Sequence, residues 1–402
     1  MSDAEDRRAI NVRGAVLSNG FAMSTTIDDR PTAHDAPRAG ALRFAPRSDY
    51  IVEAFDGADE ALAALEAVQG VVTSTAFQSL DWLIVAIEEL APAMAATPRV
   101  VVVTDKRSGE IAFALPLVIT GTHVRTARFV ELGVADCGAP LLGPAAPTNE
   151  WAMRSAWRAA RAALRDVDVV RLEQMPQRIG ARINPLLHCR GVAVARQSRG
   201  VITVETDLEA FLQSRGEEFC EGVAHGLRAL QKPGGAKFYQ ATEPNDIARV
   251  FSAFDDQQPP VADAQDAKTA QRKALRAFYE RMVIDGGEVG LSQVFALESS
   301  GEIIASLMGV IHDGVFTILR ISERDLKASR VTAGLLIIVE VLHRLGVEGV
   351  RRFEFGVAGE RYRKAFGAEA APLYDVISAG RLRGAPMAFA HRTRSRLGGT
   401  SR

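Results

Sequence analysis

Cysteine is scarce in this chain. Its 402 residues include Cys137, Cys189 and Cys220, which are widely separated and stand beside no second cysteine. Three scattered thiols are too few for a disulfide framework or for a cysteine-type zinc site. The seven histidines show no metal-ligand spacing either. We therefore expect no metal, and a reducing compartment such as the cytoplasm.

Long apolar runs and excess charge are also missing. No run of about 18 apolar residues occurs, so we expect no transmembrane segment. The charged N-terminus, MSDAEDRRAI, lacks the apolar core of a secretory signal. A formal net charge of −1 provides no general attraction for DNA or for an acidic membrane.

The most informative segment that is present runs from residue 315 to residue 366. VFTILR (315–320) predicts a strand, 329–346 a loop that leads into a helix, and VRRFEFG (350–356) a second strand. The first turn of that helix holds Thr332 and Gly334, so its free N–H groups can accept a phosphate at the positive end of the helix dipole. Neither a GxxxxGK[ST] nor a GxGxxG loop occurs at this junction, which argues against P-loop and dinucleotide sites.

The same order of elements occurs twice, as strand, turn, strand, turn, strand, helix and strand. In the first half the strands are 99–104, 111–119, 123–132 and 166–174, with a helix at 149–164 that Asn149 caps. In the second half they are 289–298, 302–311, 315–321 and 350–355, with a helix at 332–345. A further helix precedes each half, at 80–90 and at 274–283. This repetition predicts two similar α/β domains in tandem, each with a mixed, mainly antiparallel sheet flanked by helices.

The length also favours two domains. We place a disordered N-terminal segment at 1–45, where charged, Gly, Pro, Ser and Thr residues follow no period. The domains are then 46–200 and 201–380, followed by a basic flexible tail at 381–402. The tail is either solvated or in contact with an anionic partner.

In this order and spacing the segments resemble the tandem GNAT acyltransferase fold, which the Fem-type aminoacyltransferases share. The resemblance is strongest to the CelD-like, cellulose-biosynthesis-type acetyltransferases, and it covers about residues 50–380. It rests on AFQSLDWL (76–83), RFVELGVADCGAPLLGP (128–144), the helix-like LEAFLQSRGEEF (208–219), and SRVTAGLL to FEFGVAGERYRKAF (329–366). Two family patterns differ here: Ser-Pro-Gly is replaced by residues 331–334, and Tyr-Lys by Tyr362-Arg363.

The resemblance implies acetyl-CoA or another acyl-CoA as co-substrate, with the thioester between strands 315–321 and 350–355. It puts the pyrophosphate on the backbone N–H groups that begin the intervening helix. The expected cofactor-binding residues are Ser329, Arg330, Val331, Thr332, Ala333 and Gly334. Arg330 would supply a cation and Gly334 close approach. The alternative is an ordinary helix N-terminus with Thr332 as its cap.

Acyl transfer to an amine requires a base and donors for the oxyanion. Glu354 alternates with Phe353 and Phe355 and therefore faces away from them, where desolvation would raise its pKa and suit it as the base. The competing interpretation is that Glu354 is a surface carboxylate paired with Arg351 or Arg352.

A polar cluster follows this strand. Glu360 and Tyr362 are further catalytic candidates, with Tyr362 as the acid that protonates the leaving thiolate, while Arg363 and Lys364 would hold an anionic substrate or the CoA phosphates. A solvated helix start explains the same residues.

Two substrate contacts outside this cluster follow from the resemblance. Asp136, in a glycine-rich loop of the first half, would face the substrate cleft, and Gln257 lies where relatives bind the acceptor. A plain turn explains Asp136 equally well. Cys137 is a poor candidate nucleophile, because no histidine lies near it in the sequence.

The favoured interpretation is a cytoplasmic acyl-CoA-dependent N-acyltransferase that uses acetyl groups. It would act by direct transfer on the amine of a small molecule or of an envelope or polysaccharide precursor. The first half would be a scaffold, because its crossover (144–151) lacks a helix start with glycine. One rival is a catalytically degenerate tandem GNAT protein that binds a ligand or partner. Another is an aminoacyl-tRNA-dependent transferase, which the net charge disfavours.

Overall fold

Apolar runs form the strands of the first half. The computed structural model describes residues 42–44, 48–204, 207–230, 236–257, 266–324, 331–356, 359–386 and 389. The expected N-terminal disorder and most of the basic tail lie outside them. The first-half strands are β1 (Leu42–Phe44), β2 (Tyr50–Asp56), β3 (Thr97–Asp105), β4 (Ile111–Thr120), β5 (Thr126–Phe129), β6 (Leu141–Leu142), β7 (Val169–Pro176), β8 (Arg178–Ile179), β9 (Arg182–Ile183) and β10 (Val192–Thr203). Its helices are α1 (Ala58–Gln69), η1 (Ala76–Gln78), α2 (Leu80–Val85), η2 (Ala86–Leu90), α3 (Ala91–Ala93), α4 (Glu150–Ala162) and η3 (Pro185–His188).

The second half repeats this pattern with longer helices. Its strands are β11 (Ala236–Gln240), β12 (Ser292–Ser299), β13 (Glu302–His312), β14 (Val315–Glu323), β15 (Arg352–Phe355) and β16 (Glu369–Ala379). Its helices are α5 (Leu208–Gln213), α6 (Glu217–Leu230), α7 (Pro244–Gln257), α8 (Asp266–Glu288), α9 (Ala333–Val347), α10 (Glu360–Ala365) and η4 (Leu382–Gly384). In each half a strand and then helices precede three successive antiparallel strands, β3 to β5 or β12 to β14. A crossover helix, α4 or α9, then leads to a strand that pairs parallel with the third of them.

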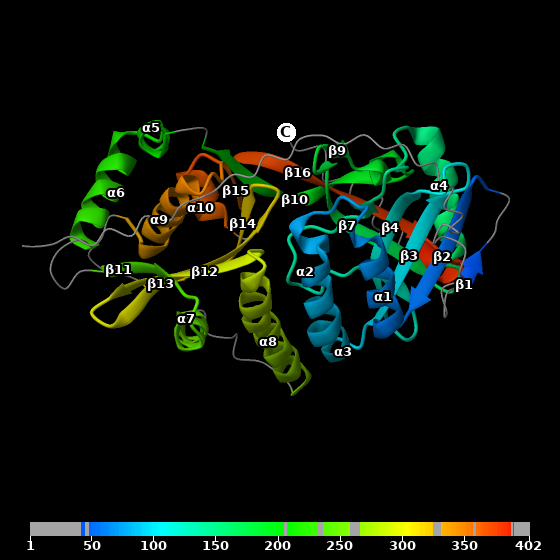
Figure 1. Ribbon diagram of the computed structural model, residues 1–402, viewed down its shortest axis with the longest axis horizontal. Helices are drawn as coiled ribbons and strands as arrows, with labels where there is room; N and C mark the ends of the chain where they lie inside the picture. The colour runs from blue at the N-terminus through cyan, green and yellow to red at the C-terminus, as the bar shows by residue number, and fades with distance from the viewer. Residues whose placement is uncertain are drawn as a thin grey trace, which may run out of the picture. The chain divides into compact units, whose positions relative to one another are not determined.

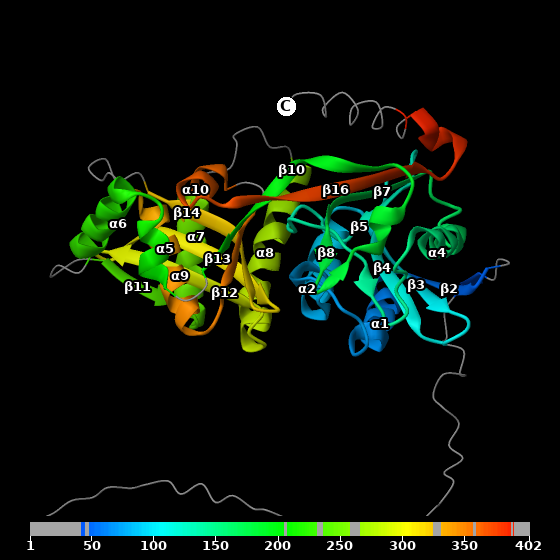
Figure 2. The ribbon, with the colours of Figure 1, turned by 90° about the horizontal axis from the view of Figure 1, so that it is seen from above.

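A single sheet runs through both halves. Its order is β1-β2-β3-β4-β5-β7-β16-β10-β15-β14-β13-β12-β11, with β6 paired to β4. The last strand, β16, lies between β7 and β10 and pairs antiparallel with both (Figure 2). The mixed α/β class with helices on both faces is thereby confirmed (Figure 1). The two repeats share one sheet, and the described residues from Gly40 onward group into one unit. The boundary placed at residue 200 stays a prediction.

Three apolar cores hold the layers together. One lies within the first half against α4, and one lies in the second half against α9. The third contains side chains of both halves. Within it, Trp82 of α2 packs edge-on against Phe278 of α8, with ring centroids 5.0 Å apart. This shared core makes the region between the halves a fixed part of the fold.

Most predicted elements are confirmed, and two differ. The strand expected at 123–132 ends at Phe129, because Leu132 and Gly133 both have positive φ and turn the chain. The helix expected at 208–219 is two helices, α5 and α6, since Gly216 at φ 104° breaks the segment.

Candidate active site

The candidate site begins where two parallel strands part. β14 and β15 pair from Val315 and Arg352 to Ile318 and Phe355. β15 then ends, whereas β14 continues to Glu323 along β13. A gap therefore opens in the sheet beyond Ile318 and Phe355, at the end of β14 from which the chain enters α9.

The N-terminus of α9 lies at the same end. Thr332 caps the helix, since its Oγ1 accepts a hydrogen bond from the Leu335 N–H at 3.3 Å. Gly334 has no room for a side chain, because a Cβ there would overlap the Tyr362 hydroxyl and the Glu323 carboxylate. The fold thus brings the predicted residues Thr332, Gly334 and Tyr362 together. Ala333 and Val331 are buried beside them in the α9 core, while Ser329 and Arg330 lie outside the described residues.

Two charged side chains that the sequence did not single out complete this end. The Gly334 N–H donates to Glu323 Oε2 at 2.5 Å, and Arg361 Nη2 lies 2.6 Å from Glu323 Oε1. Arg361 also donates to the Tyr362 hydroxyl. Burial, with the nearby Glu323 carboxylate, raises the pKa of Tyr362 to about 12, so its hydroxyl stays protonated at neutral pH.

Glu354 lies on the other face of the sheet. As alternation predicts, it points away from Phe353 and Phe355, which belong to the α9 core. Its carboxylate is 4% exposed and pairs with Arg199 of β10 at 2.5 Å and with Arg352 at 3.3 Å. The carboxylate is therefore buried and not on the surface, and it is ion-paired with Arg352, one of the two partners that the competing interpretation named. Two guanidinium groups share this one carboxylate.

Glu354 lines a cavity of about 500 Å³ to which both halves contribute. The first half supplies the loop from Ser74 to Phe77 and Cys137; the second half supplies β14 and β15 through Thr317 and Arg352, with Asp313 at the turn. Its charged side chains are Arg178, Arg199, Arg352, Asp313 and Glu354. Cations and anions thus stand in one cavity, which suits a ligand that carries both charges.

Asp136 connects the first half to the gap. A Cβ at Gly356, the residue after β15, would overlap the Asp136 carboxylate, so the two residues are in contact. Arg320 of β14 stacks on the rings of Phe254 and Tyr279, 4.5 and 5.0 Å from their centroids. The structure therefore places Asp136 at the end of the β14–β15 pair, and its role as a substrate contact stays a prediction.

Comparison with known proteins identifies the second half. Residues 220–364 match the family model described as the acetyltransferase (GNAT) domain. Residues 220–364 therefore resemble a GNAT acetyltransferase domain. That domain includes β14, α9, β15 and Tyr362, the elements that build the gap, and it marks the chain as an N-acyltransferase. No curated protein matches the chain.

Solved structures resemble this chain at low identity. FemX is 10% identical with a TM-score of 0.53, over 83% of this chain and 98% of that one. A tandem GNAT protein from the clavulanic acid biosynthesis pathway is 14% identical with a TM-score of 0.44, over 82% and 99%. A conserved protein of unknown function from Bacteroides thetaiotaomicron is 12% identical with a TM-score of 0.48, over 79% and 97%. The likeness to FemX shows a similar fold.

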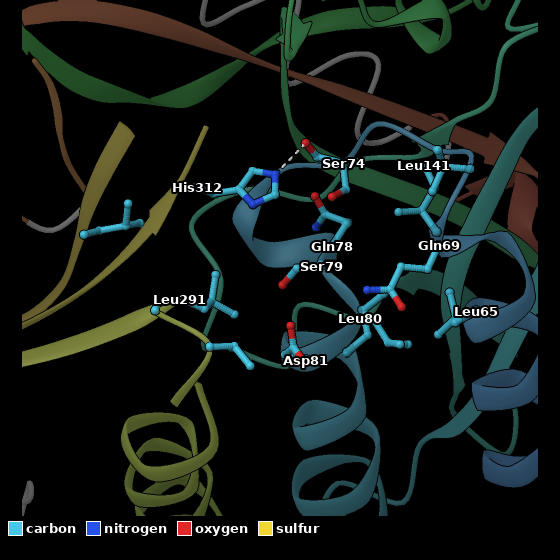
Figure 3. A pocket seen from close by; sticks show the side chains of 15 residues that line it. Leu65, Gln69, Ser74, Gln78, Ser79, Leu80, Asp81, Leu141, Leu291 and His312 are labelled. Atoms are coloured by element: carbon cyan, nitrogen blue, oxygen red, sulfur yellow. Dashed lines mark hydrogen bonds between the residues drawn. The ribbon is translucent and has the colours of Figure 1, made fainter. Parts of the chain in front are cut away.

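A second hollow, of about 350 Å³, adjoins the GNAT domain (Figure 3). Gln78, Ser79 and Asp81 of the first half line it, facing His312 of β13. The His312 ring lies 3.2 Å from the Ser74 carbonyl oxygen through Nε2. Ser74 and His312 also line the larger cavity, so the two hollows are neighbours along the contact between the halves.

Several predicted site residues lie elsewhere. Glu360 and Lys364 are exposed on α10. Arg363 turns to β10, where its Nη1 donates to the Ser198 carbonyl at 2.7 Å. Gln257 donates to the Ile303 carbonyl at 2.8 Å and lines a separate surface hollow beside α7. The structure therefore does not bring these four together with Glu354 or Asp136 in one cavity.

The remaining expectations concern thiols, metals and membranes. Burial raises the pKa of the Cys137 thiol to about 12, which leaves it protonated and unsuited to nucleophilic attack at neutral pH. The described part of the chain contains no cluster of three or more side chains able to hold a metal ion. Among the same residues, no helix has both the length and the apolar character that crossing a membrane requires.

Proposed function

We propose that the chain is an acyl-CoA-dependent N-acyltransferase that prefers acetyl groups and acts in the cytoplasm. Its acceptor is an amine on a small molecule or on an envelope or polysaccharide precursor. One observation carries the proposal: within the matched domain, β14 and β15 part beside the N-terminus of α9, and Asp136 of the first half reaches the end of that pair. A thioester in the gap would meet an amine that enters from the cavity between the halves.

The donors at the start of α9 suit an anionic cofactor. The Gly334 N–H, the Arg361 guanidinium and the positive end of the helix dipole converge there, and they already hold the carboxylate of Glu323. Residues 331–334 would hold the diphosphate, as the resemblance implies. Acyl-CoA would supply the activated acyl thioester, and the chain would supply the groups that bind it and move the proton.

The two carboxylates Asp136 and Glu354 have different roles toward the acceptor. Asp136 lies at the end of the β14–β15 pair, where the amine nitrogen must approach the acyl carbon, so it is the better placed to hold the ammonium form and to take its proton. Glu354 orders Arg199 and Arg352 on the cavity wall, and these can hold an anionic group of the acceptor. Tyr362 provides a protonated hydroxyl beside Gly334, on the opposite face of the sheet from Glu354. The attack is direct, with no covalent enzyme intermediate.

The test is thiol release from acetyl-CoA with a panel of amines, including amino acids and amino sugars. We expect Asp136→Asn to lower kcat by roughly 100-fold or more, as for loss of a general base. Asp313→Asn, at an exposed position on the cavity rim, is the control that should stay near wild type. Equal turnover in Asp136→Asn and wild type would remove the assignment.

The rival function is a degenerate GNAT protein that binds a ligand without catalysis. The replacement of Ser-Pro-Gly by residues 331–334 favours it, and so does the carboxylate held at the start of α9. Calorimetry with acetyl-CoA and with free CoA separates the two functions. Binding in the micromolar range supports the enzyme, whereas no heat at millimolar ligand supports the degenerate protein.

A further inference from the structure

The start of α9 already holds an anion of the chain's own. Glu323 is the last residue of β14 and is separated from Gly334 by the β14–α9 connection. Both of its carboxylate oxygens are engaged, one by the Gly334 N–H at 2.5 Å and the other by Arg361 at 2.6 Å. The Glu323 side chain is 10% exposed. A carboxylate therefore uses the two donors on which an incoming phosphate would depend.

We propose that Glu323 is a built-in competitor for the diphosphate of acyl-CoA, and that it sets the affinity of this site. The inference rests on the function proposed above. It goes further, because it names the residue that decides how tightly the co-substrate is held.

Charge and space both require that Glu323 leave when a diphosphate arrives. A phosphate oxygen that accepts from the Gly334 N–H must lie where Glu323 Oε2 lies, because one N–H donates one strong hydrogen bond. The Tyr362 hydroxyl and Glu323 Oε2 both lie close enough to overlap the position that a Cβ of Gly334 would take, so an added anion finds no free space beside the carboxylate there. A retained carboxylate would also repel the diphosphate across a poorly solvated site.

Replacing the Glu323 carboxylate by a phosphate leaves the number of hydrogen bonds made by Gly334 and Arg361 unchanged. When Glu323 withdraws, the Gly334 N–H and the Arg361 guanidinium each replace a carboxylate oxygen by a phosphate oxygen. The Arg361 side chain is 61% exposed and therefore has room to follow either anion. Since the donors keep a partner in both states, the difference in affinity reflects the removal of Glu323 itself.

Glu323→Gln tests the proposal with little change of shape. The glutamine carbonyl can still accept from the Gly334 N–H, so the start of α9 stays capped, but the competing charge is gone. The matched control is Glu302→Gln, which removes a carboxylate from an exposed ion pair with Arg324 at the start of β13. Circular dichroism would verify that both variants are folded.

The measurement is calorimetric titration of the full chain with free CoA and, separately, with inorganic pyrophosphate. We expect Glu323→Gln to bind both about 10-fold more tightly than wild type, which is the effect of about 1.4 kcal/mol. Glu302→Gln should stay within roughly twofold of wild type. Arg361→Gln should bind both more weakly, because it removes the shared cation.

The outcomes separate this inference from the proposed function. If wild type binds CoA and Glu323→Gln binds it no more tightly, the competitor is overturned and the acyltransferase stands. If Glu323→Gln gains affinity for pyrophosphate but no variant releases thiol from acetyl-CoA with any amine, the competitor stands and the catalytic function fails. If no variant binds CoA or pyrophosphate, both are wrong.

Discussion

The two crossover helices occupy the same place in the two repeats and differ at their first turns. α4 begins after Asn149, whose Oδ1 accepts from the Ala152 N–H at 2.9 Å, and its first residue, Glu150, pairs with Arg154 on the same helix. α9 begins after Thr332, has Gly334 in its first turn, and takes its anion from the end of the preceding strand. The N-terminal groups of α4 are bonded by residues of its own first turns. The N-terminus of α9 instead contacts side chains from β14 and α10.

The strands beside these helices differ in the same way. β5 has four residues and pairs with β7 at Thr126 and Ala127. β14 has nine residues and runs past the end of β15, which leaves the gap. The same topology thus gives two short paired strands in one half and an open gap between strands in the other, and local strand lengths and side chains make the difference.

The largest effect should come from breaking the core that joins the halves. Trp82→Ala removes a fully buried ring that packs against Phe77 and Phe278, and we expect a loss of about 3–5 kcal/mol of unfolding free energy. Trp151→Ala, on the exposed face of α4, should change stability by less than about 0.5 kcal/mol. Urea denaturation measures both, and a small effect of Trp82→Ala would show that the halves are held together mainly elsewhere.

A buried carboxyl in the first half predicts a pH effect. Burial raises the pKa of Glu131 from 4.5 to about 8, with Arg128 at 3.8 Å opposing the rise. The folded chain therefore keeps this proton at pH values where the unfolded chain has lost it. Its contribution to stability is complete below pH 4.5 and is lost as the pH rises to about 8, by about 4–5 kcal/mol in total.

Glu131→Gln, which stays neutral, isolates this contribution. Urea denaturation at several pH values should give a shallower decline in the variant than in wild type between pH 4.5 and 8. Parallel curves would rule out the raised pKa.

The two helix caps provide a smaller and more direct comparison. Asn149→Ala and Thr332→Ala each remove one cap hydrogen bond, and each should cost about 1 kcal/mol of unfolding free energy. Thr332→Ala should also weaken CoA binding, because it loosens the helix start that the proposal assigns to the diphosphate. Calorimetry that finds the same CoA affinity in both variants would contradict this difference between the helices.

The smallest effect is expected at Tyr362. Tyr362→Phe keeps the buried ring and removes the hydroxyl that accepts from Arg361, for a loss of about 0.5–1.5 kcal/mol in stability. If the hydroxyl also acts in transfer, kcat should fall more than this loss explains while the CoA affinity changes little. A kcat equal to that of wild type would leave Tyr362 a purely structural residue.

Sequence patterns predicted the repeated elements well, because apolar periodicity determines strands and helices locally. Asn149 was predicted as a cap, whereas Thr332 was named as one only in the alternative interpretation. Alternation correctly turned Glu354 away from Phe353 and Phe355. The pairing strands β10 and β16 were missed, because their burial is irregular and their partners are distant in the sequence.

The site was harder to predict than the fold. Arg199 lies 155 residues from Glu354, and Glu323 and Arg361 flank Gly334 from two different elements. No spacing within one helix or strand reveals such partners. The sequence held one signal for Glu323: it is an acidic residue just before the connection to a helix that contains Gly334. This signal indicates a contact only when the end of β14 at Glu323 is known.

The position of β16 has a consequence for how the protein is made. The strand that completes the sheet beside β7 is synthesised some two hundred residues after β7 itself, so the first half leaves the ribosome with an open sheet edge. The edge of β7 stays unpaired until residues 369–379 have been synthesised. An unpaired edge strand favours chaperone binding and slow final assembly of the sheet. A stop codon shortly before β16 should therefore impair both repeats, although it removes none of the elements of the first.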